Sequence, residues 1–465
     1  MRFLNFVWIL GLLTPLLPAQ IDIEEGPIPG RLYSRDLATN QAVVPISGKV
    51  VVPNCDRIHL VVNQDGIPWS SDVANLDYSN GDPPFVFKPT IEAGLRNYSF
   101  ELLLESGGQT QRAIFVDHIV CGDVFLINGQ SNAVASDYHN EGLGNQNQTP
   151  WVRSYGSSSL VEQEVVSDAK WHIADGIQVY ASGTVGAWGL RAASLISDRF
   201  QIPIGLLNGA VGGTTVSQHA RDDIQPENLS TIYGRLLYRA REAGIDQTVR
   251  GLLWHQGESD GPTPPADYIA AWRELRNDWL YDYPALEHLF VFQVRRGCGI
   301  SNMKIREIQR TCGDFFSDVT VLPTAGINEH DGCHFTYSGY RRMGNWMAAA
   351  IAKRLYGVTI SDKKLPPNLK EARFTSPAHD EIELVFRSTN QTLVLDPGVE
   401  SYMSLGAGIN ESVVSASTSP GRIILTLSGS TAATEIIYRG HMGAGPWIKN
   451  SDGVGAFTFR VPIIP

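Results

Sequence analysis

The chain has 465 residues, of which 43% are hydrophobic, and a formal charge of −11 at pH 7 from 37 Lys and Arg against 48 Asp and Glu. This length predicts two or three domains, and the composition is that of a soluble protein with enough apolar residues for a full core. The acidic balance argues against nucleic acid and anionic membrane surfaces as partners, because both would repel it, and it leaves the oligomeric state open.

Residues 1–19 carry the pattern of a secretory signal peptide. Arg2 precedes an apolar run at 6–13, and a Pro-Leu-Leu-Pro-Ala segment follows and ends at Ala19. The run is shorter than the about 20 apolar residues that a membrane anchor needs. We therefore expect cleavage near Ala19 and export to the periplasm or the extracellular space.

Two β-rich regions flank the centre of the chain. Residues 20–118 hold short apolar runs separated by turns rich in Gly, Pro, Asn and Asp, which predicts a small antiparallel β-sandwich with a structural role. Residues 361–465 alternate apolar and polar residues without a helical period, which predicts a second small β domain. The predicted strands lie at 48–52, 58–62, 85–87, 98–104 and 113–116, and then at 382–386, 392–395, 423–427, 435–438 and 457–461.

Residues 119–360 alternate buried strands with helical stretches. Such alternation predicts an α/β domain in which helices cover both faces of a parallel sheet. The helix at 337–356 shows the pattern best, because Tyr340, Met343, Met347 and Ile351 recur at three- and four-residue spacing. The predicted strands lie at 124–127, 204–207, 251–254, 290–294 and 319–322, and the predicted helices at 190–200, 229–243, 266–281 and 337–356.

Ser131 is the candidate nucleophile. It lies in a polar Gly-Gln-Ser-Asn turn directly after the apolar strand 124–127, at the carboxyl end where parallel sheets place reactive groups. Gly129 permits the sharp turn and the close backbone approach that such a position requires. A serine hydroxyl is a weak nucleophile, so a base, a group that orients the base and donors for an oxyanion must accompany it.

A D-x-x-H pair before the last helix of this domain supplies two of these groups. His334 would take the proton of Ser131 and later deliver it to the leaving group. Asp331, three residues earlier, would hold the other ring nitrogen and set the tautomer. A zinc site in this segment is disfavoured, because no second Cys/His pair occurs at a recognisable spacing. We expect neither a metal nor an organic cofactor.

Three separated motifs carry a resemblance to a known family. In chain order they are Gly129-Gln130-Ser131-Asn132, then Trp254-His255-Gln256-Gly257-Glu258-Ser259-Asp260, and then Asp331-Gly332-Cys333-His334-Phe335. Together they resemble the blocks of the SGNH hydrolase superfamily, and their wording is similar to its sialate O-acetylesterase branch of carbohydrate esterases. The resemblance covers roughly residues 110 to 355. It implies a three-layer α/β/α sandwich and a serine esterase that removes acetyl groups from a carbohydrate.

The resemblance also implies roles for residues outside the Ser-His-Asp set. One glycine N–H, from Gly212 rather than Gly213, would join the Ser131 N–H as an oxyanion donor. The side-chain amide of Gln256 would be the third donor; the wider superfamily has asparagine in this block. The residues expected to bind substrate are Gln130, Asn132, His255 and Glu258, with His219, Trp188, Arg295 and Arg296 as weaker candidates for the pocket wall.

Five cysteines in an exported chain leave at least one unpaired. Cys298 and Cys312 flank a short polar loop and are the favoured disulfide, with Cys55 and Cys121 as a second candidate pair. Cys333 would then be the odd thiol, and a rival pairing joins it to Cys312.

The function that best fits these observations is an exported serine esterase that removes O-acetyl groups from sialic acid or from a plant or algal polysaccharide, through an acetyl-enzyme. Two rival interpretations remain. One is a glycosidase that uses an Asp/Glu pair, and the other is a non-catalytic carbohydrate-binding protein on a hydrolase fold.

Overall fold

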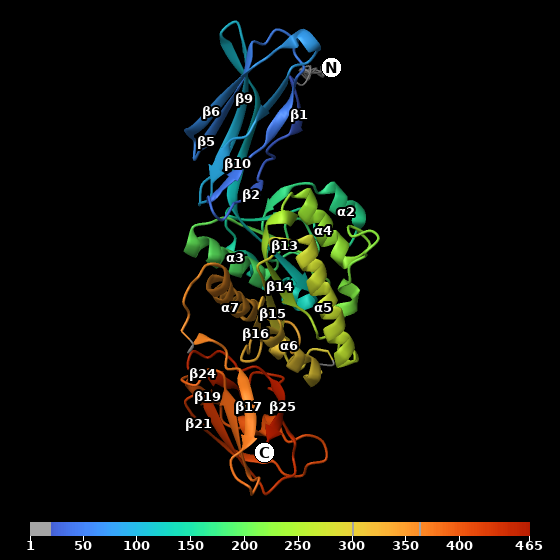
Figure 1. The fold of residues 1–465 in the computed structure, drawn as a ribbon, viewed down its shortest axis with the longest axis vertical. Coiled ribbons are helices and arrows are strands. Elements are labelled where there is room, and N and C mark those ends of the chain that lie inside the picture. The colour runs from blue at the N-terminus through green and yellow to red at the C-terminus, as the bar shows by residue number, and fades with distance from the viewer. Residues whose placement is uncertain (1–19, 300–301, 362–363) are drawn as a thin grey trace, which may run out of the picture. The chain divides into compact units, whose positions relative to one another are not determined.

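The structure is a computed structural model that describes residues 20–299, 302–361 and 364–465 (Figure 1). Two compact units make up the chain. The first contains the described residues up to Ile28 together with Val43–Ile91 and Asn97–His118, and the second contains Pro29–Ala42, Glu92–Arg96 and Ile119–Pro465. The expected signal peptide at 1–19 lies outside the described residues. The division into domains at 118 and 360 stays a prediction.

The first unit is built from antiparallel strands. One sheet has the order β1 (Ile21–Glu25), β4 (Ile46–Val50), β7 (Pro84–Phe87), and β5 (Arg57–Gln64) pairs with both β6 (Ile67–Asn75) and β9 (Tyr98–Ser106). Every second residue of β5 is buried, as the period of a half-buried strand requires. Asp65 and Gly66 both have positive φ, which suits the tight turn that joins β5 to β6.

A largely parallel sheet forms the centre of the second unit. Its order is β12-β11-β13-β10-β14-β15-β16, every pair is parallel except β11 with β12, and β2 pairs with β10 beside it. Strands β13, β14 and β15 are buried along their whole length, which explains their continuous apolar sequences. The strands are β2 (Leu32–Ser34), β10 (Gln109–Gly129), β11 (Val152–Tyr155), β12 (Trp171–Ile173), β13 (Ile204–Asn208), β14 (Val249–His255), β15 (His288–Gln293) and β16 (Val319–Pro323).

Helices lie on both sides of these strands, with α3 and α7 together on one side and α4 and α5 on the other (Figure 1). The apolar stripe of α7 is buried against the sheet and α3, and Gly357 has a positive φ just beyond the end of the helix. The helices are α1 (Ser131–Val134), α2 (Glu162–Ser167), α3 (Ala187–Phe200), α4 (Ile232–Glu242), α5 (Pro265–Asp282), α6 (Met303–Phe315) and α7 (Tyr337–Leu355).

Helix α6 was not expected from the sequence. Its buried face is mostly polar, with Ile305 and Cys312 beside Arg306, Gln309 and Arg310, so the apolar stripe that marks an amphipathic helix is weak. Backbone carbonyls supplied by other segments make this face stable. Arg306 donates to the Arg439 carbonyl and Gln309 to the Gln256 carbonyl.

The C-terminal part of the second unit is a β structure with a core of its own. A seven-stranded sheet has the order β20-β23-β25-β17-β18-β22-β21 and is antiparallel except for β17 with β25, and β19 pairs with β24 separately. Its strands are β17 (Leu369–Phe374), β18 (Glu381–Phe386), β19 (Leu393–Leu395), β20 (Met403–Ser404), β21 (Val413–Ser419), β22 (Arg422–Leu427), β23 (Glu435–Tyr438), β24 (Ile448–Asn450) and β25 (Phe459–Ile464).

Candidate active site

Ser131 lies directly beyond the end of the central strand β10. The last residue of that strand, Gly129, has φ +135°, and a Cβ there would be 2.1 Å from the carbonyl oxygen of His255, so no side chain fits. The Gln130 N–H donates to the same carbonyl at 2.9 Å. Ser131 then begins the short helix α1, so its hydroxyl stands at the carboxyl edge of the sheet.

His334 reaches Ser131 from a loop 203 residues further along the chain. Its Nε2 lies 3.1 Å from Ser131 Oγ. The ring stacks on Tyr138, with centroids 4.1 Å apart, and the Tyr138 hydroxyl donates to the Ser131 carbonyl. Burial lowers the pKa of His334, although the carboxylates of Asp331 and Glu258 oppose this effect. The imidazole is therefore neutral at pH 7 and can accept a proton.

Asp331 organises the loop that carries His334. Its Oδ1 accepts the N–H groups of Cys333 and His334 at 2.7 and 2.8 Å. Its Oδ2 lies 4.0 Å from His334 Nδ1, which is too long for a hydrogen bond, and 3.8 Å from His139 Nε2. Burial would raise the pKa of Asp331, but the two N–H groups and the two histidines lower it. A charged carboxylate thus faces the imidazole at ion-pair distance.

Gly212 lies against Ser131 on the other side of the site. A Cβ built on Gly212 would be 3.7 Å from Ser131 Cβ and 3.3 Å from the Tyr180 hydroxyl. The Gly212 N–H donates to that hydroxyl at 2.8 Å. The N–H that was expected to bind the oxyanion is therefore bound to the phenolic oxygen of Tyr180. Tyr180 has φ +50°, a backbone conformation that is rare for residues other than glycine and that persists where surrounding structure enforces it.

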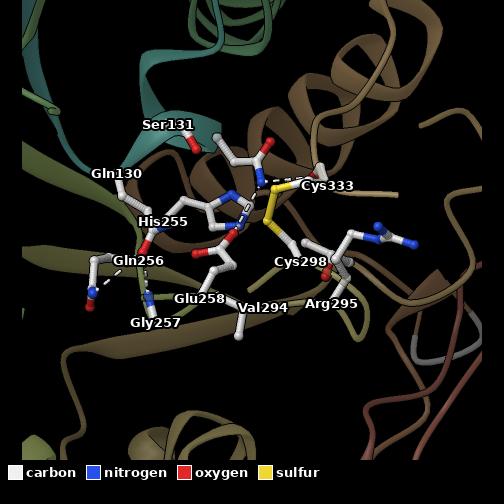
Figure 2. Close-up of polar contacts among 12 residues, drawn as sticks. Gln130, Ser131, His255, Gln256, Gly257, Glu258, Val294, Arg295, Cys298 and Cys333 are labelled. Carbon is white, nitrogen blue, oxygen red and sulfur yellow. Dashed lines mark hydrogen bonds and ion pairs between the residues drawn. A yellow bond between two sulfur atoms is a disulfide. The ribbon is translucent and has the colours of Figure 1, made fainter. Parts of the chain in front are cut away.

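The structure does not bring the Gln256 amide to Ser131, in contrast to the expectation from the sequence. The side chain is fully buried, and its Nε2 donates to the Thr214 carbonyl at 3.0 Å and to the Asp260 carboxylate. The Gln130 side chain extends from the Ser131 turn toward Gln256 and Gly257 (Figure 2). Gln256 is directed away from Ser131 because two loops supply its acceptors, the Thr214 carbonyl after β13 and the Asp260 carboxylate after β14.

The four residues expected to bind substrate are also buried, and their role in substrate binding stays a prediction. Gln130, Asn132, His255 and Glu258 expose at most 3% of their surface. The Gln130 Oε1 accepts the N–H groups of Gly257 and Ser259 within the loop after β14. In this structure these side chains contact one another and nearby backbone, as buried polar groups require.

Asn132 joins three segments of the site. Its Nδ2 donates to Glu258 Oε1 at 3.0 Å and to the Cys333 carbonyl at 3.2 Å, and its Oδ1 accepts the Tyr340 hydroxyl. Because Cys333 precedes His334, this amide holds the loop that carries His334 beside Ser131.

Glu258 carries a buried negative charge that acts on the His334 imidazole. Burial by itself would raise its pKa, but His255, whose Nε2 lies 3.1 Å from Glu258 Oε1, and the Asn132 amide lower it below the usual value. The carboxylate therefore stays ionised, and its field favours a positive charge on His334.

The model of one protein family matches residues 121–353, which is half of the chain and includes every motif described above. Its description is "Carbohydrate esterase, sialic acid-specific acetylesterase". The chain belongs to this family. It is accordingly an enzyme of the carboxylic ester hydrolase class, a carbohydrate O-acetylesterase. No curated protein matches the chain.

One of three similar solved structures supports the mixed α/β fold of the esterase. A carbohydrate acetylesterase from Xanthomonas citri is similar with a TM-score of 0.63 and 17% identity, over 95% of this chain and 99% of that one. A protein from Arabidopsis thaliana has a TM-score of 0.40 and 21% identity, over 50% and 98% of the two chains. A family two carbohydrate esterase from Cellvibrio japonicus has a TM-score of 0.32 and 10% identity, over 72% and 95%. The likeness to the Xanthomonas protein extends to the fold alone, because the identity is low.

The esterase contains a disulfide between Cys298 and Cys333, so the favoured Cys298–Cys312 pairing is wrong. Cys312 is buried in α6 as a free thiol, and burial raises its pKa to about 12. Cys55 and Cys121 are free as well, so neither the second candidate pair nor the rival Cys312–Cys333 pair forms. The sequence did not show that the loop after β15 and the His334 loop meet at the same edge of the sheet.

The four weaker candidates for the pocket wall all contact other groups of the protein. The Arg295 guanidinium donates to the carbonyls of Gly332 and Met442, and burial lowers its pKa to about 10. The other three also bind backbone or side-chain groups of the protein: the Trp188 indole donates to the Asn132 carbonyl, the Arg296 guanidinium donates to the Gly440 carbonyl, and His219 is buried beside the Thr214 hydroxyl.

Three residues near the catalytic groups were missed in the sequence. Tyr138, His139 and Tyr180 lie in segments without regular structure, where no period indicates which side chains face the site. The described parts of the chain contain no group of three or more His, Cys, Asp or Glu that could hold a metal ion. Within the same residues, no helix has the length and apolar character needed to cross a bilayer.

Proposed function

We propose that this chain is an SGNH-type serine esterase, with a three-layer α/β/α core, that removes O-acetyl groups from an acetylated carbohydrate. The observation that carries the proposal is the 3.1 Å contact between Ser131 Oγ and His334 Nε2 at the carboxyl edge of a largely parallel sheet. A neutral imidazole at hydrogen-bond distance from a serine hydroxyl is the arrangement that activates serine as a nucleophile.

In the first half of the reaction, Ser131 Oγ attacks the acetyl carbonyl carbon while His334 Nε2 takes the hydroxyl proton. The charge that develops on the imidazole faces the carboxylates of Asp331 and Glu258. The tetrahedral intermediate then collapses, the bond to the sugar oxygen breaks, and His334 returns its proton to that oxygen. The products of this half are the free sugar hydroxyl and acetyl-Ser131.

The oxyanion is stabilised by backbone N–H groups. The Ser131 N–H is the first of helix α1, where N–H groups have no acceptor within the helix, and the Gly212 N–H lies beside the nucleophile. The acetyl oxygen displaces the Tyr180 hydroxyl from the Gly212 N–H. Gln256 supports this arrangement indirectly, because it holds the loop to which Gln130 is bound.

In the second half, a water molecule attacks the acetyl carbonyl of acetyl-Ser131. His334 takes a proton from this water and then gives it to Ser131 Oγ as acetate leaves. The enzyme returns to its starting state, and the net change is hydrolysis of one ester. The residues of the chain perform these steps without a metal or an organic cofactor.

Acetate release by the full-length enzyme tests the proposal. Ser131→Ala and His334→Ala are each expected to lower kcat at least about 10⁴-fold on a chromogenic acetate ester. Ser197→Ala, which alters a buried serine of α3 remote from these motifs, is the matched control and should keep full activity. Undiminished acetate release by either of the first two variants would disprove the assignment.

The same enzyme preparations separate the rival functions. A glycosidase would cleave chromogenic glycosides and leave acetate esters intact. A non-catalytic carbohydrate-binding protein would keep its function in Ser131→Ala.

The substrate class in the proposal is an acetylated carbohydrate, with sialic acid and plant or algal polysaccharides as candidates. A screen of acetate release across defined acetylated glycans would identify the sugar and the hydroxyl position. Export is part of the proposal and rests on the residue pattern at 1–19.

A further inference from the structure

A cavity lies along the free edge of the central sheet. It has a volume of about 750 Å³ and is lined by β16, the second half of α7, part of α6 and the first segments of the C-terminal β structure. A cavity of this size falls in the range of ligand sites in proteins. In the described part of the chain β16 is the last strand of its sheet, so its outer backbone groups bind no further strand.

The lining of this groove is basic, in contrast to the protein as a whole. Among the described residues its charged side chains are Asp314 and six cations, whereas the full chain has 37 Lys and Arg against 48 Asp and Glu. Asp314 is neutralised by its ion pair with Arg387. The cations are Arg199, Arg310, Lys353, Arg354, Lys364 and Arg387.

Four of these cations have no acidic partner within the parts of the chain that the structure describes. Arg387 pairs with Asp314, and Arg310 pairs with Glu307. Among the described residues the remaining four form no salt bridge, although Arg354 donates to the Thr320 hydroxyl on β16. Like charges gathered without counter-charges repel one another, and a polyanion bound among them would relieve that repulsion. The four are Arg199, Lys353, Arg354 and Lys364.

Trp346 gives the groove an aromatic wall. The indole is half-buried, because one side packs on the core of the central domain while the residue also lines the groove. A large, rigid aromatic surface with a polar N–H suits contact with a sugar ring, whose faces carry C–H groups and whose rim carries hydroxyls. Unpaired backbone groups of β16 can bind such hydroxyls.

We infer that this groove binds an acidic polysaccharide, a sugar chain that carries carboxylates, and thereby anchors polymeric substrate to the enzyme. Guanidinium and ammonium groups match carboxylates, and the aromatic wall matches pyranose rings. An extended peptide could add to the edge of β16, but the charge and the family's carbohydrate chemistry favour the glycan. The inference rests on the proposed function only in its choice of a sugar polymer.

The groove is separate from the catalytic centre. Helix α7 begins at Tyr337, three residues after His334, and Lys353 and Arg354 lie near its other end. At 1.5 Å per residue this places the two cations about 25 Å along the helix from the catalytic loop. Changes in the groove are therefore expected to alter binding of a polymer and to leave hydrolysis of a small ester unchanged.

The test uses full-length Ser131→Ala protein, which cannot turn over substrate, and polygalacturonate as the probe. Binding is measured by calorimetry at two salt concentrations, with neutral dextran of similar length as the reference polymer. We expect polygalacturonate to bind, dextran to bind at least about tenfold more weakly, and added salt to weaken the polygalacturonate complex.

Charge reversal then locates the site. Lys353→Glu with Arg354→Glu should weaken polygalacturonate binding at least about tenfold, which corresponds to about 1.4 kcal/mol. The matched control, Arg273→Glu with Lys304→Glu, makes the same change of net charge at two exposed positions outside the groove and should have little effect. If the first pair impairs folding, Lys353→Glu with Lys364→Glu takes its place.

Three results would overturn the inference. They are equal binding of dextran and polygalacturonate, unchanged binding after charge reversal in the groove, and an equal loss in the control pair. Binding of an extended peptide with no binding of polygalacturonate would assign the groove to a protein partner instead. Hydrolysis of the small acetate ester by protein with intact Ser131 reports separately on the proposed catalytic function.

Discussion

Gln256→Met distinguishes two roles for this glutamine, as an oxyanion donor or as a support of the loop. In either role the loss of the amide costs about 3 kcal/mol, but the cost appears in a different measurement. The substitution keeps the length and volume of the side chain and removes its amide. If the amide is an oxyanion donor, its loss raises the transition-state energy by about 3–4 kcal/mol and slows turnover by about 10²–10³-fold. If it holds the loop, as the contacts with Thr214 and Asp260 indicate, the cost appears in the stability of the fold.

The magnitude of the stability effect follows from the bonds that are lost. The hydrogen bond to the Thr214 carbonyl is worth about 0.5–1.5 kcal/mol, and the one to the buried Asp260 carboxylate about 1.5–3 kcal/mol. Asp260 keeps the Val216 N–H and the Thr263 hydroxyl as donors, so its charge stays solvated by the protein. We expect the free energy of unfolding to fall by about 3 kcal/mol.

The assay combines denaturant unfolding with initial rates on a chromogenic acetate ester, taken far below the melting temperature. We expect turnover to slow by less than about tenfold, because the remaining effect on Ser131 is transmitted through Gln130. Gln293→Met is the matched control: this glutamine is buried and makes three hydrogen bonds to Arg306 and Thr458, and its loss should destabilise the fold without changing turnover. If Gln256→Met kept its full stability and turned over substrate about a hundredfold more slowly or worse, the reasoning would be refuted.

Three further predictions concern the base, a buried charge and the disulfide. Because burial lowers the pKa of His334, kcat/KM on a non-ionising ester should rise with pH to a plateau with a midpoint below 6.5; a midpoint above that value would contradict it. Asp123→Asn should cost about 3–5 kcal/mol in denaturant unfolding, since it breaks a buried ion pair. The lowered pKa of Asp123 means that this stabilisation is present above the unfolded pKa near 3.8 and is lost as pH falls through the folded value. Replacing both Cys298 and Cys333 by serine should lower the free energy of unfolding by about 2–4 kcal/mol. It should also slow turnover, because the His334 loop loses its covalent link. Full activity of this variant would contradict that role of the disulfide.

Local sequence patterns predicted the strands and helices whose buried faces consist of apolar side chains. The strands of the central sheet and the stripe of α7 were visible because a strand or helix buried against apolar neighbours must repeat apolar residues at its own period. Helix α6 was missed because its buried face binds backbone carbonyls from distant segments. The same difference explains the site, where the turn at Ser131 was predicted and the direction of the Gln256 side chain was not.

The sequence alone determined the fold class, the family and the location of the Ser131 turn, because strand periods, glycine at a tight turn and motif order are properties of neighbouring residues. Only the tertiary structure decided which side chains meet. The pairing of Cys298 with Cys333 and the contact of Asn132 with Glu258 join segments that are far apart in the chain. The motifs predicted that His334 would act on Ser131, and the structure supplied the geometry of that contact. Such contacts depend on how parallel strands align their carboxyl ends in space, and no local pattern of residues records that alignment.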